Sequence, residues 1–457
     1  MNDRTGTTGT TGTTRPPVLP PPAWALPEPV RQRLPGGVEL VGYDVPGQYV
    51  LSLRLVLPVP LGLEPRALEG IATIMARSMD EGTQRHEAEQ LAELLERKGV
   101  AFGVNVGEAG ITVEVEVAKR RLGEAVALLA EIVREPVFPD QEVDRQVRTR
   151  LAEIDREHAA PGQRAALQFL PTYFAAPERA SRPTGGAAGT VAAITAGDVR
   201  TFHREVLGPV GATLVVAGDL AGLDVAAPAA AALADWPDQP RPPLAAGSAS
   251  TDRAADADRV VFVDRPGSVQ TEFYIGCPGP DRRHPSWAAY PLLSFVVGGS
   301  PTSRVDAVLR EEKGYTYGIR SGFRPRPRGG LFLTTGSVRA DATVESLALL
   351  LGILDRDGFT EEEVRGGADF IAMTAPARFA TADALADEAA TLALDGMSTE
   401  FTSANLARVG TLTPQEVTTC YREFVDGRWT VVLVGDASRY ADGVRALGRG
   451  EVSVVPA

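Results

Sequence analysis

The chain has 457 residues, of which 44% are hydrophobic, and a net charge of −13. At this length roughly two to four domains are expected. The negative charge, with four histidines and no basic run, argues against nucleic acid or an anionic membrane surface as a partner. No apolar run reaches the roughly 18 residues of a membrane-spanning helix. Two distant cysteines, Cys277 and Cys420, indicate neither disulfides nor a cysteine metal site. We therefore expect a cytoplasmic protein.

Residues 1–33 begin with Thr/Gly repeats and continue with prolines (MNDRTGTTGTTGTTRPPVLPPPAWALPEP). One positive charge precedes these repeats, and the segment lacks the apolar core of a secretion signal. A segment of this composition has little to bury, so we predict a disordered tail over 1–33.

Strands and helices follow in separate runs. Alternating or continuous apolar patterns predict strands at 38–45, 49–59, 100–106, 111–118 and 212–219. Apolar residues at helical spacing predict helices at 67–79, 86–98, 121–134, from 139 onward and at 196–205. Hairpin strands followed by runs of helices indicate an α+β fold, with helices packed on one face of a mostly antiparallel sheet.

The second half of the chain repeats the first. TAGDVRTFHREV in the first half and TPQEVTTCYREF in the second place Val199 opposite Val417. Each segment is followed by a buried strand that ends in Gly-Asp, at Asp219 and at Asp436. A repeat of about 200 residues is a duplicated domain and not a solenoid. We predict an N-terminal domain at 34–223, an Ala/Pro-rich linker at 224–258 and a C-terminal domain at 259–457.

A helix followed by a strand is predicted near residue 310. Apolar residues at i, i+3 and i+4 form one stripe over 304–313, and Gly314 ends this helix. The alternation in YTYGI beyond the glycine predicts a strand with one buried face. Considered alone, the pattern is typical of a solvated arginine and a core tyrosine.

The same unit resembles the second half of the pitrilysin-like zinc peptidases, the inverzincin group that includes insulinase and the mitochondrial processing peptidase subunits. In that family a Gly-rich turn leads into a helix that ends L-R-E-x-x-G-x-x-Y. The matching residues here are Leu309, Arg310, Glu311, Gly314 and Tyr317, preceded by the turn Gly298, Gly299 and Ser300. The resemblance implies that Arg310 and Tyr317 hold the backbone of a peptide substrate, opposite the zinc.

The catalytic motif of that family, H-x-x-E-H, is lacking. The family pattern G-L-A-H-F-L-E-H-M-L-F-x-G-T aligns with GIATIMARSMDEGT at 70–83. Thr73 stands at the first His, Ala76 at the general base and Arg77 at the second His, while Glu153 keeps the spacing of the third ligand. Arg is a permanent cation that repels a metal ion. We therefore predict a degenerate metal site without zinc, in which Arg77 pairs with Glu153.

Other catalytic motifs have little support in the sequence. His86-Glu87 begins like H-E-x-x-H, but Gln90 occupies the second His position, and amide oxygens are poor zinc ligands. The remaining histidines occur singly, and the chain has no nucleophile elbow, phosphate loop or dinucleotide-binding motif.

These observations and the resemblance, which covers 34–436, imply a non-catalytic, substrate-binding subunit of a heterodimeric zinc metallopeptidase. The partner, a homologous H-x-x-E-H chain, would supply the zinc, so no cofactor is expected in this chain. A peptide or short unfolded polypeptide would add as a strand to an exposed sheet edge. Two alternatives stay open, a free-standing peptide-binding scaffold and an independent enzyme with another active site.

Overall fold

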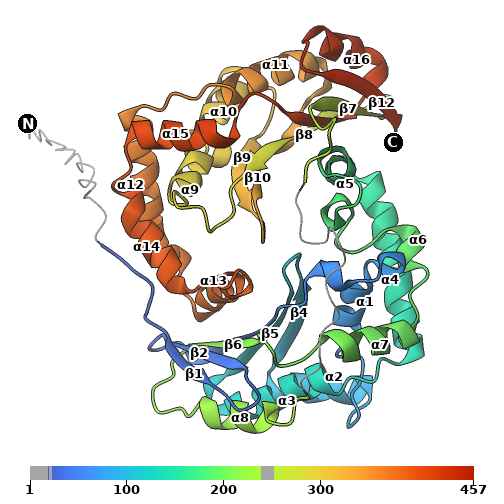
Figure 1. Cartoon of the computed structure of the whole chain (residues 1–457), viewed down its shortest axis with the longest axis vertical. Helices are drawn as coiled ribbons and strands as arrows, with labels where there is room; N and C mark the ends of the chain where they lie inside the picture. The colour runs from blue at the N-terminus through green and yellow to red at the C-terminus, as the bar shows by residue number, and fades with distance from the viewer. Residues whose placement is uncertain (1–18, 20–22, 238–251) are drawn as a thin grey trace, which may run out of the picture.

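The computed structural model of the chain describes residue 19 and residues 23–237 and 252–457. Figure 1 shows two α+β halves, one above the other, the first running from blue to green and the second from yellow to red. In the part of the chain that is described, no helix is both long and apolar enough to cross a membrane.

The first half contains a six-stranded sheet in the order β1-β2-β6-β3-β5-β4. Its strands are β1 (Val30–Arg33), β2 (Glu39–Asp44), β3 (Val50–Leu57), β4 (Ala101–Val106), β5 (Ile111–Ala118) and β6 (Thr213–Gly218). All neighbours are antiparallel except β2 and β6. Every second residue of β5 is buried, because alternate side chains of a strand point to opposite faces of the sheet.

The second half contains an equivalent sheet in the order β12-β7-β11-β8-β10-β9. Its strands are β7 (Arg259–Asp264), β8 (Gln270–Gly279), β9 (Ile319–Pro325), β10 (Gly330–Arg339), β11 (Thr430–Gly435) and β12 (Glu451–Pro456). β7 pairs in parallel with β11 and β12, and the other neighbours are antiparallel.

Helices of each half cover one face of its own sheet and enclose its main core. In the first half these helices are α1 (Ile71–Ser78), α2 (Ala88–Lys98), α3 (Leu122–Arg134), α4 (Asp140–Ala159), α6 (Ala188–Val191), α7 (Ala196–Val206) and α8 (Ala226–Leu233). In the second half they are α9 (Ala289–Ser294), α10 (Arg304–Asp306), α11 (Thr343–Leu354), α12 (Glu361–Arg378), α14 (Thr399–Val409), α15 (Pro414–Phe424) and α16 (Ala437–Ala446). The α+β fold with mostly antiparallel sheets is confirmed.

One helix of each half lies on the sheet of the other half. α5 (Pro161–Tyr173) packs on β8 and β11 of the second sheet, and α13 (Ala382–Leu394) packs on β3 and β6 of the first. Each exchanged helix has its own small core, containing Phe169 in one case and Leu385 in the other. The apolar stripe of a helix does not specify which sheet it covers, so the sequence did not predict this exchange.

The two halves of the chain also share an equivalent hydrogen bond. Asp219 Oδ2 accepts a hydrogen bond from the Gly47 backbone N–H at 2.9 Å, and Asp436 Oδ2 accepts one from the Gly267 N–H at 3.0 Å. The turns after β2 and β7 are thereby tied to the ends of β6 and β11. The predicted duplication is visible in side-chain chemistry as well as in strand order.

Two of the predicted segment boundaries require correction. Part of the expected tail is ordered, because β1 pairs with β2 and Leu26 is buried against α13. Residues 1–18 and 20–22 of the expected tail lie outside the described part. The expected linker begins with α8, which packs on α3 and buries Leu233 and Trp236. Residues 238–251 also lie outside the described part.

Candidate functional site

The helix that aligns with the zinc-binding helix is α1. Thr73 and Arg77 are four residues apart and half-buried, so they share one side of the helix. Ala76 is buried in the core. Gly70, at the N-cap, has φ 102°, and a Cβ there would lie 2.8 Å from the carbonyl oxygen of Gly185. Only glycine fits this approach of the two segments without strain.

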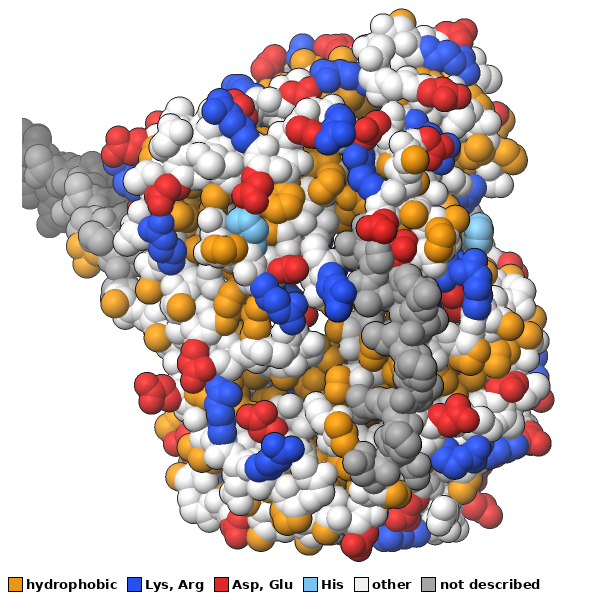
Figure 2. All heavy atoms as spheres, viewed as in Figure 1, with side chains coloured by type: hydrophobic (Ala, Val, Ile, Leu, Met, Phe, Trp, Pro, Cys, Tyr) orange, Lys and Arg blue, Asp and Glu red, His pale blue; other side chains and the backbone are white. Residues whose placement is uncertain are grey.

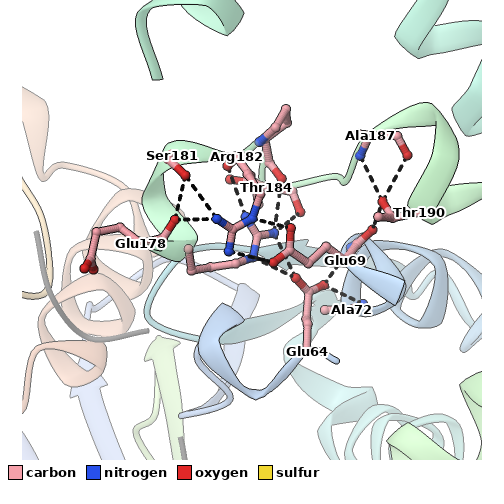
Figure 3. A network of polar contacts seen from close by, with 12 residues as sticks. Glu64, Glu69, Ala72, Glu178, Ser181, Arg182, Thr184, Ala187 and Thr190 are labelled. Carbon is pink, nitrogen blue, oxygen red and sulfur yellow. Dashed lines mark hydrogen bonds and ion pairs between the residues drawn. The ribbon is translucent and has the colours of Figure 1, made fainter. Parts of the chain in front are cut away.

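A buried carboxylate fixes the start of α1 (Figure 3). The Glu64 side chain is fully buried and accepts hydrogen bonds from the backbone N–H groups of Gly70 and Ala72, both at 3.1 Å. Arg179 donates to the same carboxylate from Nε at 3.1 Å and from Nη2 at 2.8 Å. The carboxylate thus satisfies unpaired N–H groups of the helix end and lies at its positive pole.

A second ion pair joins the same two segments. Arg182 donates to both carboxylate oxygens of Glu69, at 2.6 and 2.8 Å, and the Thr190 hydroxyl donates to the Glu69 backbone carbonyl at 2.7 Å (Figure 3). The sequence does not predict this network, because Arg179 and Arg182 lie more than 100 residues from their partners. These two ion pairs therefore fix the start of α1, although α1 lacks the catalytic residues of the family.

Arg77 and Glu153 are in contact, as predicted. Arg77 Nη1 lies 2.8 Å from Glu153 Oε2, and Arg150 Nη1 donates to the same oxygen at 3.2 Å. Partial burial raises the pKa of Glu153, but the hydrogen bonds from both arginines outweigh it and hold the pKa below its ordinary value of 4.5. The side chains are 36% and 25% exposed, so the pair is not a buried one.

These residues do not fit a zinc ion. Zinc requires deprotonated Cys, neutral His or carboxylate ligands, whereas Arg77 brings a cation to the only retained carboxylate, Glu153. Thr73 and Ala76 supply neither a ligand of these types nor a base. Among the described residues, no group of three or more His, Cys, Asp or Glu side chains could hold a metal ion.

Replacing Arg77 with Ala is expected to lower the free energy of unfolding by about 0.2–1 kcal/mol at pH 7, since both partners are partly exposed. Because the pKa of Glu153 is depressed in the folded state, the pair stabilises the fold above the ordinary carboxyl pKa and loses its effect as pH falls through the folded-state value. Urea unfolding of both proteins at pH 7 and at a pH below the folded-state pKa of Glu153 measures this difference. A loss that persists undiminished at the lower pH would contradict the assignment.

The predicted Gly-rich turn is the end of a π-helical segment, Phe295–Gly299. A Cβ on Gly298 would lie 2.6 Å from the Ser321 side chain, and a Cβ on Gly299 would lie 2.7 Å from the Ser294 carbonyl oxygen. Gly298 therefore allows the helix to pack directly on β9, whereas Gly299 fits closely against the preceding turn of its own helix. Ser300, which follows them, is buried, and its hydroxyl lies 3.3 Å from that of Thr302.

The helix that carries Arg310 also ends in a π-helical turn, Ala307–Glu312. In the first half, the Val100 N–H bonds to the Leu95 carbonyl, whereas in the second half the Tyr315 N–H bonds to the Leu309 carbonyl, one residue further back. Leu309 is buried and Arg310, which follows it, is exposed. π turns of this kind occur frequently at functional sites.

Tyr317 lies in a loop, so its prediction as a strand residue is wrong. β9 begins at Ile319, and the Tyr317 side chain is 95% exposed. The first-half residue at the same distance from the helix-ending glycine, Phe102, lies in β4 and packs on the core. The second half therefore exposes an aromatic side chain where the first half partly buries one.

Arg310 has weak partners within the chain. Its Nη1 lies 3.9 Å from Asp306 Oδ2 and its Nε lies 3.4 Å from Glu311 Oε1. Its side chain is 40% exposed, so it is available to a ligand. Among the described residues, no hydrogen bond or ion pair joins Arg310 to Tyr317 or either of them to the Arg77–Glu153 pair.

Comparisons with known proteins agree over most of the chain. Residues 54–187 match the family described as Insulinase (Peptidase family M16), and residues 193–367 match the Peptidase M16 inactive domain. An uncharacterized zinc protease of Streptomyces coelicolor is 24% identical over 428 residues, covering 91% of this chain and 92% of that protein. A similarly described protein of Mycobacterium tuberculosis is 24% identical over 347 residues, covering 75% and 78%.

Solved structures share the fold. A peptidase M16 inactive domain from Pseudomonas fluorescens superposes with a TM-score of 0.81 at 21% identity, covering 89% of this chain and 98% of that one. A protease from Helicobacter pylori gives a TM-score of 0.81 at 16% identity, covering 90% and 100%. Both matches extend over the two halves of the chain.

Proposed function

Because the chain belongs to the pitrilysin and insulinase family of peptidases, we propose that it is the non-catalytic, substrate-binding subunit of a heterodimeric zinc metallopeptidase. Its partner is a homologous chain that supplies H-x-x-E-H and the zinc. The pair cleaves peptides or short unfolded polypeptides, and we place it in the cytoplasm.

The observation that carries this proposal is the contact between Arg77 and Glu153. A guanidinium group lies where the family has a metal ligand, and it neutralises the carboxylate that corresponds to the third ligand. Water activation by a metal is therefore unavailable on this helix. The peptide bond must be cleaved by groups of another chain.

The second half supports a substrate-binding role. Arg310 is a permanently charged donor on a π turn, and Tyr317 is an almost fully exposed aromatic residue with a hydroxyl group. Both can donate hydrogen bonds to carbonyl oxygens of an extended peptide. In this chain, their task is to bind and orient the peptide backbone, while the partner acts on the scissile bond.

We expect the isolated chain to bind no stoichiometric zinc and to cleave no peptide, because Thr73, Ala76 and Arg77 remove the ligands and the base. Elemental analysis after zinc loading and removal of excess metal, together with a peptide-library assay, measures both properties. The matched control is the triple variant Thr73→His/Ala76→Glu/Arg77→His, in which Glu153 completes a zinc-binding set. Zinc should appear in the control alone. Chelator-sensitive cleavage by the unaltered chain would refute the proposal.

A further inference from the structure

Strand β9 and the turn that follows it are strongly basic. Residues 319–330, IRSGFRPRPRGG, contain four arginines and no acidic residue, in a chain with a net charge of −13. On the face of the molecule in Figure 2, by contrast, basic and acidic side chains are interspersed over both halves. Such a local excess of one sign attracts ligands of the opposite sign.

Two of the four arginines are engaged within the chain and two are not. Arg320 Nη1 lies 2.8 Å from Asp306 Oδ2, and Arg326 pairs with Glu108 of the β4–β5 turn through Nε at 2.9 Å. Arg324 and Arg328 are exposed and have no ion-pair partner among the residues that the structure describes. Their charges are available to a ligand.

The arginines of β9 begin close to Arg310, one of the two proposed substrate-binding residues. Arg310 Nη1 and Arg320 Nη1 both approach Oδ2 of the fully buried Asp306, at 3.9 and 2.8 Å. Arg324 lies four residues further along β9, so its side chain starts from the same face as that of Arg320. Arg328 follows in the turn between β9 and β10. We call Arg320, Arg324 and Arg328 the arginine strip.

A peptide cannot simply add as a strand beside β9. The Ile319 N–H donates to Asp306 Oδ1 at 3.2 Å and the Phe323 N–H donates to Ser294 Oγ at 2.9 Å. Pro325 and Pro327 have no N–H to offer. Binding of a peptide along β9 therefore depends on the arginine side chains. Their planar guanidinium groups can form two parallel hydrogen bonds with a carboxylate.

We propose that the arginine strip binds acidic side chains of the peptide and thereby selects acidic substrates. The inference rests on the proposed substrate-binding role and adds the substrate class to it. The peptide backbone lies at Arg310 and Tyr317, and its acidic residues extend toward Arg324 and Arg328. Of the nearby carboxylates, Asp306 is buried and Glu108 is paired with Arg326. Glu311 lies beside Arg310, and Asp281 accepts a hydrogen bond from the Gly329 backbone N–H at 3.1 Å. Among the described residues, none of these four carboxylates forms an ion pair with Arg324 or Arg328.

The test uses three peptides that share one core and carry Glu, Gln or Lys at alternate flanking positions. Fluorescence anisotropy measures binding of each to the full-length chain, and cleavage by the reconstituted pair is followed in parallel. We expect the Glu peptide to bind roughly 2- to 30-fold more tightly than the Gln peptide, since each exposed arginine–carboxylate pair contributes modestly. Added salt should reduce this advantage.

Charge reversal identifies the residues responsible. The variant Arg324→Glu/Arg328→Glu is expected to prefer the Lys peptide over the Glu peptide. The control is Arg120→Glu, which alters an exposed arginine of the first half that also lacks an ion-pair partner in the described part of the chain. This control should keep the preference of the unaltered chain.

The outcomes separate the two proposals. Equal binding of the three peptides, or an unchanged preference in the double variant, overturns the role of the arginine strip, even if the two chains together cleave peptides. A preference for the Glu peptide that the double variant reverses supports the strip. If that preference is found but no H-x-x-E-H chain confers cleavage, the two-chain function fails and the strip stands.

Discussion

Replacing Arg179 with Ala is expected to lower the free energy of unfolding by about 3–5 kcal/mol, because it leaves a buried carboxylate without its cation. The Glu64 side chain is fully buried and that of Arg179 is 6% exposed. The remaining donors to Glu64 are two backbone N–H groups at the start of α1. Urea unfolding followed by circular dichroism measures the change.

Two further variants test the origin of this loss. Arg445→Ala removes the arginine of an exposed pair with Asp442, with side chains 48% and 98% exposed, and should cost about 0.2–1 kcal/mol. The double variant Arg179→Met/Glu64→Gln removes both charges and should be destabilised less than the sum of its single changes. Strict additivity would show that the two side chains act independently and would contradict the assigned ion pair.

Replacing Arg310 with Ala is expected to lower cleavage by the assembled pair roughly 10- to 100-fold, which corresponds to the loss of about 1.5–3 kcal/mol from a charge-assisted hydrogen bond. Tyr317→Phe removes only a hydroxyl group and should cost less, about 0.5–1.5 kcal/mol of a neutral hydrogen bond. Steady-state kinetics of the reconstituted pair with one peptide substrate measures both effects.

The fold should tolerate these two substitutions. Tyr317 is 95% exposed, and the partners of Arg310, Glu311 and Asp306, lie only at 3.4 and 3.9 Å. The buried Asp306 keeps its closer ion pair with Arg320, at 2.8 Å, when Arg310 is removed. Melting temperature and association with the catalytic chain are therefore expected to change little. Full activity of the double variant, in a complex shown to be intact, would mean that the motif at 309–317 is only structural and would favour the free-standing scaffold.

Local periodicity predicted most elements of the fold correctly. The alternation in ITVEVEVA indicated β5, and the repeat indicated two equivalent sheets, because side-chain period follows directly from backbone geometry. The sequence could not predict that α5 and α13 exchange sheets. Both helices are apolar on the side they bury, and the choice between two sheets depends on the length and path of connections far from the helix itself.

The candidate site was predictable in part. The alignment of 70–83 correctly predicted the contact between Arg77 and Glu153, because Arg77 occupies the position of one zinc ligand of the family and Glu153 that of another. Exposure of Tyr317 was not predictable, because YTYGI alternates as a strand does, yet π-helical turns before it shift the start of β9 to Ile319. The Glu64–Arg179 ion pair has no local signal, because neither residue lies in a motif.

Reconstitution with a partner tests the central claim most directly. The chain is mixed with a homologous H-x-x-E-H chain from the same organism, and peptide cleavage is measured for each chain alone and for the mixture, with and without a zinc chelator. We predict cleavage only in the mixture, abolished by the chelator and restored by zinc. Equal cleavage by the partner without this chain, or cleavage by this chain alone, would contradict a division of the active site between two subunits.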